Sequence, residues 1–314
     1  MSRLDPGKRV TAGGVQTGTR VVLVAFVVFT LLATNQLLGL TADTDQYFAW
    51  HIHDEPTAAF LGAAYAAGFL LSFLALRQDR WSHIRVALAT VTVFALLTAV
   101  ATVIHLHLFH LTAGGPVARF AGWLWLAVYF VIPVACLVVV GRQERRRVRA
   151  EAARQPMPGW LIALLAAQGA ALFVAGAVLF AGGATRHHIP KGWTGFWPLP
   201  LAPMTSQAVG AWLIAFGFAA AMVIRERDLN RALVPAAAYT AFGVLELLVV
   251  FRYQAQLSAD DPWLWAYVAV LASIVPIGVY GWSSARHRPR AAAAYADTAE
   301  RSPSDVVGPD RPTR

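Results

Sequence analysis

The chain has 314 residues, of which 57% are hydrophobic and only 14% are charged. A soluble globule of this size needs more polar surface than that composition provides, so a soluble protein is excluded and an integral membrane protein is indicated. The formal net charge is +9, and the positions of the basic residues explain it without nucleic acid.

Eight segments are long and apolar enough to be transmembrane helices. A helix needs about 20 mainly apolar residues to cross the hydrocarbon core of a bilayer, and in lipid only helices and closed barrels satisfy the backbone polar groups. The loops between the segments are short, which favours helices. The sequence therefore predicts an all-α integral membrane protein with eight transmembrane helices, at 20–40, 57–76, 86–109, 118–140, 160–182, 207–224, 232–251 and 263–283.

Basic residues fall on one side of this predicted bundle. If the N-terminus is cytoplasmic, every Lys and Arg lies on the cytoplasmic side except Arg119, Arg186, Lys191 and Arg252. Cytoplasmic segments retain Lys and Arg, so we expect both termini inside, in a multi-pass protein of the plasma membrane, the inner membrane of a bacterium. The basic run at 142–154 is expected to lie at anionic lipid headgroups rather than on nucleic acid.

The second half of the chain repeats features of the first half in the same order. The equivalent pairs are Trp50 and Trp197, Pro56 and Pro203, Thr57 and Thr205, Gly62 and Gly210, Arg77 and Arg225, Arg85 and Arg231, the WLW triplets at 123–125 and 263–265, and Pro133 and Pro276. Each copy has an even number of helices, so both copies enter the membrane in the same direction. We therefore predict a four-plus-four parallel internal repeat, whose halves are related by an axis along the membrane normal.

The repeat divides the chain into segments. We expect a cytoplasmic tail at 1–19, a first four-helix repeat at 20–141, a basic cytoplasmic linker at 142–158, a second four-helix repeat at 159–284 and a disordered cytoplasmic tail at 285–314. Binding sites in such proteins commonly lie between the repeats. The junction of the two halves is therefore the expected place for a site.

Histidines gather on the predicted outer side of the membrane. On an α-helix His107 and His110 would be about 60° apart and share a face, and His51 and His53 would project to one side of an extended loop. Imidazole nitrogens bind zinc, copper or iron, so these four residues are candidate ligands for a metal or haem. The alternative is that histidines end helices at the membrane interface, where a ring with a polar tip is well tolerated.

The outline of eight helices in two four-helix halves is similar to haem A synthase, a family that binds haem through histidines in its helices. That resemblance implies haem between helices. The fourth, sixth and eighth predicted helices contain no histidine, so two bis-histidine haems cannot be built in this chain. The resemblance is therefore one of architecture only.

Glu246 is the carboxylate that lies deep within a predicted helix. A charge at the centre of a membrane helix costs on the order of 2.5–3.5 kcal/mol, so such residues usually face the bundle interior and often serve ions or protons. Glu246 is accordingly a candidate solute or proton site. Asn35, Gln36 and Gln168 are further polar candidates at depth, for which hydrogen bonding between helices is the alternative role.

The sequence contains no Walker A motif, no G-x-G-x-x-G opening a helix, no G-x-S-x-G and no HExxH, so no conventional enzymatic machinery is indicated. The leading hypothesis is a membrane protein that transports or binds a small or lipophilic solute between its two four-helix halves. One alternative is a membrane redox or metal-handling protein that uses the outer histidines. Another is a scaffold, either a homo-oligomer or a subunit of a membrane complex.

Overall fold

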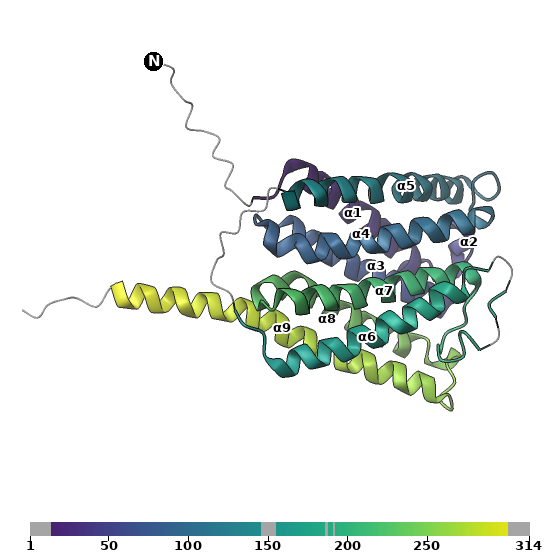
Figure 1. The fold of residues 1–314 in the computed structure, drawn as a ribbon. Helices are drawn as coiled ribbons and strands as arrows, with labels where there is room; N and C mark the ends of the chain where they lie inside the picture. The colour runs from purple at the N-terminus through teal and green to yellow at the C-terminus, as the bar shows by residue number, and fades with distance from the viewer. Residues whose placement is uncertain (1–13, 146–154, 186–187, 191, 301–314) are drawn as a thin grey trace, which may run out of the picture.

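A computed structural model describes residues 14–145, 155–185, 188–190 and 192–300, with side chains up to Arg286. Regular structure in these residues is helical, and eight of the helices are long and apolar enough to cross a membrane (Figure 1). The prediction of an all-helical chain with eight membrane-spanning helices is confirmed to that extent. Most of the predicted basic linker and the tail residues 301–314 lie outside the described residues.

In the first half, short helical turns follow the first and the third long helix. In chain order its elements are α1 (Thr17–Thr34), η1 (Asn35–Gly39), η2 (Thr41–Asp43), α2 (Thr44–Tyr47), α3 (Glu55–Leu76), α4 (Trp81–Ile104), η3 (Leu106–Leu108) and α5 (Pro116–Arg145). The turn η1 is π-helical and completes the first spanning helix. α4 ends before the predicted limit at 109, because the backbone of His105 already has non-helical angles.

The second half has the same succession of long helices. Its elements are α6 (Gly159–Gly182), α7 (Pro203–Glu226), α8 (Leu229–Arg252), η4 (Gln254–Gln256) and α9 (Pro262–Glu300). α7 is longer than the predicted 207–224, since Pro203 occupies the first turn, where its missing N–H costs nothing. It ends at Glu226, and the next residue, Arg227, has a left-handed φ of 48°. The predicted C-terminal tail begins inside α9.

The bundle has two chemically distinct ends. The start of α1 and the end of α9 lie on the same side, at the left of Figure 1. We call this the arginine-rich end, after Arg77, Arg85, Arg142, Arg225 and Arg231. We call the opposite end the histidine-rich end, after His51, His53, His105, His107 and His110.

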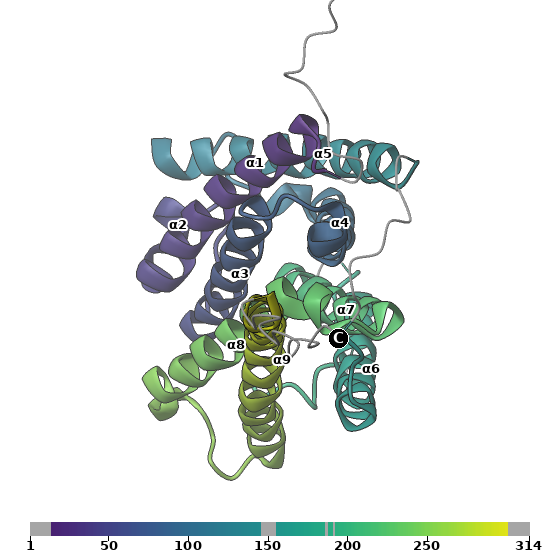
Figure 2. The same cartoon turned by 90° about the vertical axis from the view of Figure 1, so that its left-hand side faces the viewer.

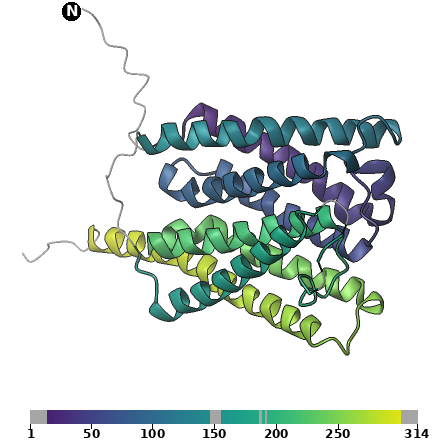
Figure 3. The same cartoon turned by 45° about the vertical axis from the view of Figure 1, so that its right-hand side comes forward.

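The two halves pack against each other through their inner helices. α3 of the first half packs on α8 of the second, and α4 packs on α7 (Figure 2). Within the halves, α1 packs on α3 and α4 on α5, while α6 packs on α7 and α8 on α9. Figure 3 shows the halves lying one above the other. The second helix of each half therefore contacts the third helix of the other.

Two glycines allow the first and second helices of each half to approach closely. A Cβ atom at Gly62 would lie 2.7 Å from the backbone nitrogen of Leu38, and one at Gly210 would lie 2.7 Å from the carbonyl oxygen of Gly176. Real Cβ atoms essentially never come so near. Both positions therefore require glycine, and they are equivalent in the sequence comparison of the halves.

The segment before the first helix of each half pairs with the turn between its second and third helices. In the first half the amide of Val15 donates to the carbonyl of Asp79 at 3.1 Å, and in the second half the amide of Leu229 donates to the carbonyl of Gln155 at 2.9 Å. These bonds hold the starts of α1 and α6 at the arginine-rich end.

Candidate functional site

A cavity with a free volume of about 90 Å³ lies where the two halves meet. All eight spanning helices contribute to its walls. The side chains that line it are almost all apolar, and in the described part of the chain none of them is charged. Its aromatic residues are Phe26, Phe29, Tyr65, Phe94, Tyr129, Trp212, Phe216 and Tyr239. We call it the interhelical cavity.

Trp212 of α7 organises the aromatic wall of this cavity. Its ring stacks on Phe94 of α4, with centroids 3.9 Å apart and an interplanar angle of 27°, and Tyr65 of α3 meets it edge-on at 5.2 Å. Gly68 leaves room for the indole, because a Cβ atom there would lie 2.9 Å from Cη2 of Trp212. Rings from both halves thus restrain one another, so the wall is formed before any ligand enters.

Most polar groups at the cavity are already paired. The hydroxyls of Tyr65 and Tyr129 are 2.8 Å apart and share a hydrogen bond. Tyr239 donates to Oε1 of Gln168 at 3.2 Å, and Gln168 donates from Nε2 to Ser273 at 2.6 Å. The predicted site residue Gln168 therefore lies behind the cavity wall, where it joins α6 to α8 and α9.

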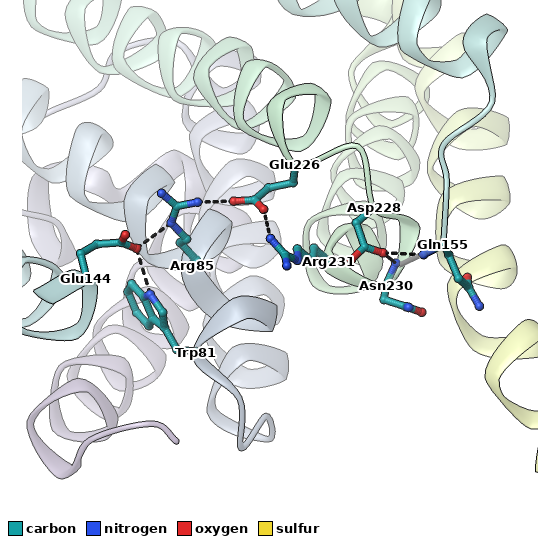
Figure 4. A network of polar contacts seen from close by, with 8 residues as sticks. All are labelled: Trp81, Arg85, Glu144, Gln155, Glu226, Asp228, Asn230 and Arg231. Carbon is teal, nitrogen blue, oxygen red and sulfur yellow. Dashed lines mark hydrogen bonds and ion pairs between the residues drawn. The ribbon is translucent and has the colours of Figure 1, made fainter. Parts of the chain in front are cut away.

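At the arginine-rich end, a network of charged side chains joins the halves (Figure 4). Arg85 of α4 and Arg231 of α8 each bind one carboxylate oxygen of Glu226, at the end of α7. Arg85 also donates from Nε to Glu144 of α5 at 2.6 Å, and the Trp81 indole donates to the same oxygen at 2.9 Å. Glu226 and Arg231 are each 9% exposed. Loss of one partner would leave a buried charge uncompensated.

Asp228 extends this network to the segment before α6. It pairs with Nε of Arg231 at 3.3 Å and accepts bonds from the backbone amides of Asn230 and Gln155, at 3.1 and 3.2 Å. Ala232, which follows Arg231 in α8, lines the interhelical cavity. The network thus lies beside the cavity at the arginine-rich end.

Arg85 and Arg231 are equivalent positions in the repeat that the sequence predicts, but their shared partner Glu226 is not predicted from the sequence. The predicted sixth helix stops at 224, which leaves Glu226 in a solvated turn. The carboxylate stands between Arg225 and Arg227 in the chain, so local charge pairing is the obvious interpretation. One weak signal in the sequence could identify Glu226 as a site residue. It is an acidic side chain close to the end of a helix that is predicted to lie between the two repeats.

Glu246 is fully buried in α8 but does not line the interhelical cavity. Its Oε2 accepts a hydrogen bond from the Tyr267 hydroxyl of α9 at 2.9 Å, and its Oε1 has no partner among the described residues. The ring of Tyr267 packs edge-on against Trp197, with centroids 5.4 Å apart. Glu246 therefore belongs to a separate polar position between α8, α9 and the loop before α7.

Asn35 and Gln36 lie at the histidine-rich end, in the π-helical turn η1. The side chain of Asn35 is exposed and that of Gln36 is half-buried. Neither residue lines the interhelical cavity, so the structure does not bring these two predicted site residues together with Gln168 or Glu246.

The helical face expected for His107 and His110 is not formed, because α4 ends before them and 106–108 is a 3-10 turn. His107 is exposed, and Nδ1 of His110 donates to the carbonyl of Phe48 at 3.0 Å. His105 is the buried histidine of this stretch, with Nε2 lying 2.9 Å from the carbonyl oxygen of Gly183. The rings of His105 and His107 lie 6.2 Å apart, whereas His107 and His110 do not share a helical face.

His51 and His53 lie side by side, with ring centroids 4.1 Å apart, as expected for an extended loop. Partial burial, and after it the charge of His53, hold the pKa of His51 below its usual value, while Asp45 acts in the opposite direction. In the residues that the structure describes, no three His, Cys, Asp or Glu side chains are placed to hold a metal ion.

No protein-family model, curated protein or solved structure matches this chain. Function is therefore inferred from the geometry of the interhelical cavity, the ion network and the histidine-rich end.

Proposed function

We propose that this protein binds a small lipophilic solute in the interhelical cavity and transports it through the membrane. The observation that carries the proposal is the cavity itself, which is aromatic, uncharged and built from helices of both halves. Small-molecule sites are typically concave and mostly apolar, with a few polar groups. The solute is expected to be uncharged, because a buried charge without a partner is very costly.

The proposal includes a parallel repeat, in which the two halves are copies of one four-helix unit. It is supported by the reciprocal packing of α3 on α8 and of α4 on α7 and by the matching close approaches at Gly62 and Gly210. Transport would then be a rocking of one half against the other around the cavity. The Glu226 network joins the halves, so its contacts would have to break when the arginine-rich end opens.

We also propose that the arginine-rich end faces the cytoplasm of a bacterium, next to anionic lipids. The described basic residues at the opposite end are Arg119 and Arg252, and this asymmetry is the support for that orientation. The protein would lie in the inner membrane with both termini inside.

Glu246 is proposed as a proton or solute-linked site that is separate from the cavity. Its burial and the unpartnered Oε1 support a role in ion or proton handling. Glu246→Gln preserves the shape of the side chain, so transport by this variant should lose its pH dependence. An unchanged pH profile would remove Glu246 from the mechanism.

The pair of His51 and His53 is the observation that favours the second candidate function, a metal or haem site at the histidine-rich end. Elemental analysis and an absorption spectrum of the purified protein test it against the His51→Ala and His53→Ala variants. A scaffold role predicts instead a stable homo-oligomer or a co-purifying membrane subunit.

The proposed function is tested by titrating 1-aminoanthracene, an uncharged fluorescent ring compound, into the purified protein in lipid nanodiscs. Ala219 lines the cavity, and Ala221, two residues along the same helix, is exposed. We expect Ala219→Phe to weaken binding by about tenfold or more, which corresponds to about 1.4 kcal/mol, and Ala221→Phe to bind like the unaltered protein. Equal binding by both variants would show that the probe does not occupy the cavity.

A further inference from the structure

The interhelical cavity has polar atoms that an apolar solute would leave unused. Ser72 and Trp212 both line it and are 1% and 5% exposed. Oγ of Ser72 and Nε1 of Trp212 have no hydrogen-bond partner within the part of the chain that the structure describes. Buried polar groups in native proteins are nearly always paired, so each exception asks for an explanation.

Other hydroxyls at the cavity do not share this property. Thr30 donates to the carbonyl of Phe26 at 2.6 Å, and Thr90 donates to the carbonyl of Val86 at 2.8 Å. Each is satisfied within its own helix. Other buried atoms without a partner, such as Nε1 of Trp50 and of Trp197, occur in the described residues, but those two residues do not line the cavity.

Ser72 and Trp212 belong to the same wall of the cavity. Gly68, whose Cβ position is 2.9 Å from the Trp212 ring, is four residues before Ser72 in α3. Residues four apart lie on one face of a helix. The hydroxyl and the indole therefore both lie where α3 of the first half faces α7 of the second.

We infer that the cavity takes a flat, uncharged ring compound with a carbonyl oxygen, of the quinone or aromatic ketone class. The carbonyl oxygen would accept hydrogen bonds from Nε1 of Trp212 and Oγ of Ser72. This inference rests on the proposed function of the cavity. An indole N–H can only donate, so the ligand has to supply the acceptor, and the aromatic wall of Trp212, Phe94 and Tyr65 suits a flat ring.

Charge and size agree with this ligand class. Arg85 and Arg231, the cations beside the cavity, are already bound to Glu226, which disfavours an anionic solute. A free volume of about 90 Å³ corresponds to roughly six water molecules, or on the order of 180 Å³ of liquid. A flat compound of two or three fused rings is of that order of size.

The experiment compares menadione, a two-ring quinone, with 2-methylnaphthalene, which has the same rings without the carbonyls. Both are titrated by calorimetry into the full-length protein in nanodiscs. We expect menadione to bind about fivefold to tenfold more tightly, the effect of a hydrogen bond or two. Trp212→Phe and Ser72→Ala should each lower the ratio of menadione affinity to 2-methylnaphthalene affinity, because lost packing weakens both compounds whereas a lost donor weakens menadione alone. Trp123→Phe, on an indole that is 58% exposed, is the matched control.

The outcomes separate the inference from the proposed function. If both compounds bind equally and compete with 1-aminoanthracene, the carbonyl inference is overturned while the cavity remains a lipophilic site. If neither compound nor 1-aminoanthracene binds, the proposed function itself fails. Should Trp212→Phe lower the melting temperature of the free protein, Ser72→Ala decides alone, because removal of one hydroxyl leaves the ring packing intact. An unchanged menadione preference in Ser72→Ala would then overturn the inference.

Discussion

Arg85 and Arg231 lie in different halves of the chain, yet they bind the two oxygens of a single carboxylate, that of Glu226. The two arginines are equivalent in the sequence comparison of the halves, whereas Glu226 is not matched by an acid. Gln78 stands at the corresponding position, directly after Arg77. One acidic side chain therefore joins two matching basic ones, and it does so at the junction that the cavity occupies.

Glu226→Gln should destabilise the protein strongly. It leaves the buried Arg231 and the partly buried Arg85 near each other without their shared carboxylate, and breaking a buried pair costs about 3–5 kcal/mol. Asp79→Asn is the control, because Asp79 pairs with Arg20 at 2.8 Å but its side chain is 91% exposed, and exposed pairs contribute about 0–1 kcal/mol. Thermal unfolding in detergent measures both. Similar melting temperatures for the two variants would contradict the structural role of Glu226.

Gly210→Ala should disturb the packing of α6 on α7. The new methyl group would lie 2.7 Å from backbone atoms of α6, and overpacking typically costs about 1–3 kcal/mol. Gly141→Ala is the control, because nothing lies within 4 Å of the Cβ atom that it adds. It should leave the free energy of unfolding unchanged or raise it by up to about 1 kcal/mol. Melting temperature and gel-filtration profile report the difference. If Gly210→Ala behaves like Gly141→Ala, the close approach is wrong.

His51 should titrate below the usual imidazole pKa of 6.5, since partial burial and the neighbouring His53 disfavour its charged form. A lower pKa in the folded state means that the unfolded state binds more protons as the pH falls through 6.5. Stability from this group is therefore fully present above that pH and declines toward acid. NMR titration of the ring protons in micelles measures the pKa.

The control for this titration is a pair of single substitutions. His53→Asn removes the nearby charge and should raise the pKa of His51, while His83→Asn, at the opposite end of the bundle, should leave it unchanged. A pKa of His51 that is the same in both variants would argue against the coupling of the two rings.

The proposed orientation can be read from cysteine labelling, because Cys136 is the single cysteine of the chain and is buried. In a Cys136→Ser background, His53→Cys should react with a membrane-impermeant maleimide in intact cells. Arg80→Cys should react after the cells are permeabilised. Both side chains are exposed, so access depends on the side of the membrane, and the reverse labelling pattern would invert the topology.

The eight spanning helices follow from the sequence because a long apolar run has one stable structure in lipid. Helix ends were less predictable. The segment 86–109 was predicted as one helix from its apolar length, but the chain leaves the α-helix at His105 and forms a 3-10 turn. Three histidines enter the sequence at 105–110, but histidine is tolerated at the end of a membrane helix as well as beyond it, so it does not mark the residue at which α4 ends. The expected pairing of His107 and His110 on one helical face was wrong for this reason.

Length and hydropathy determined by themselves that this chain forms a bundle of helices long and apolar enough to cross a membrane, since the stability of an apolar helix in lipid depends on local composition. The cavity, the Glu226 network and the unpaired atoms of Ser72 and Trp212 were decided by the tertiary structure alone. Each depends on which helix faces meet between the two halves. In lipid, where both faces of a helix are apolar, the sequence pattern does not mark the face that packs inward.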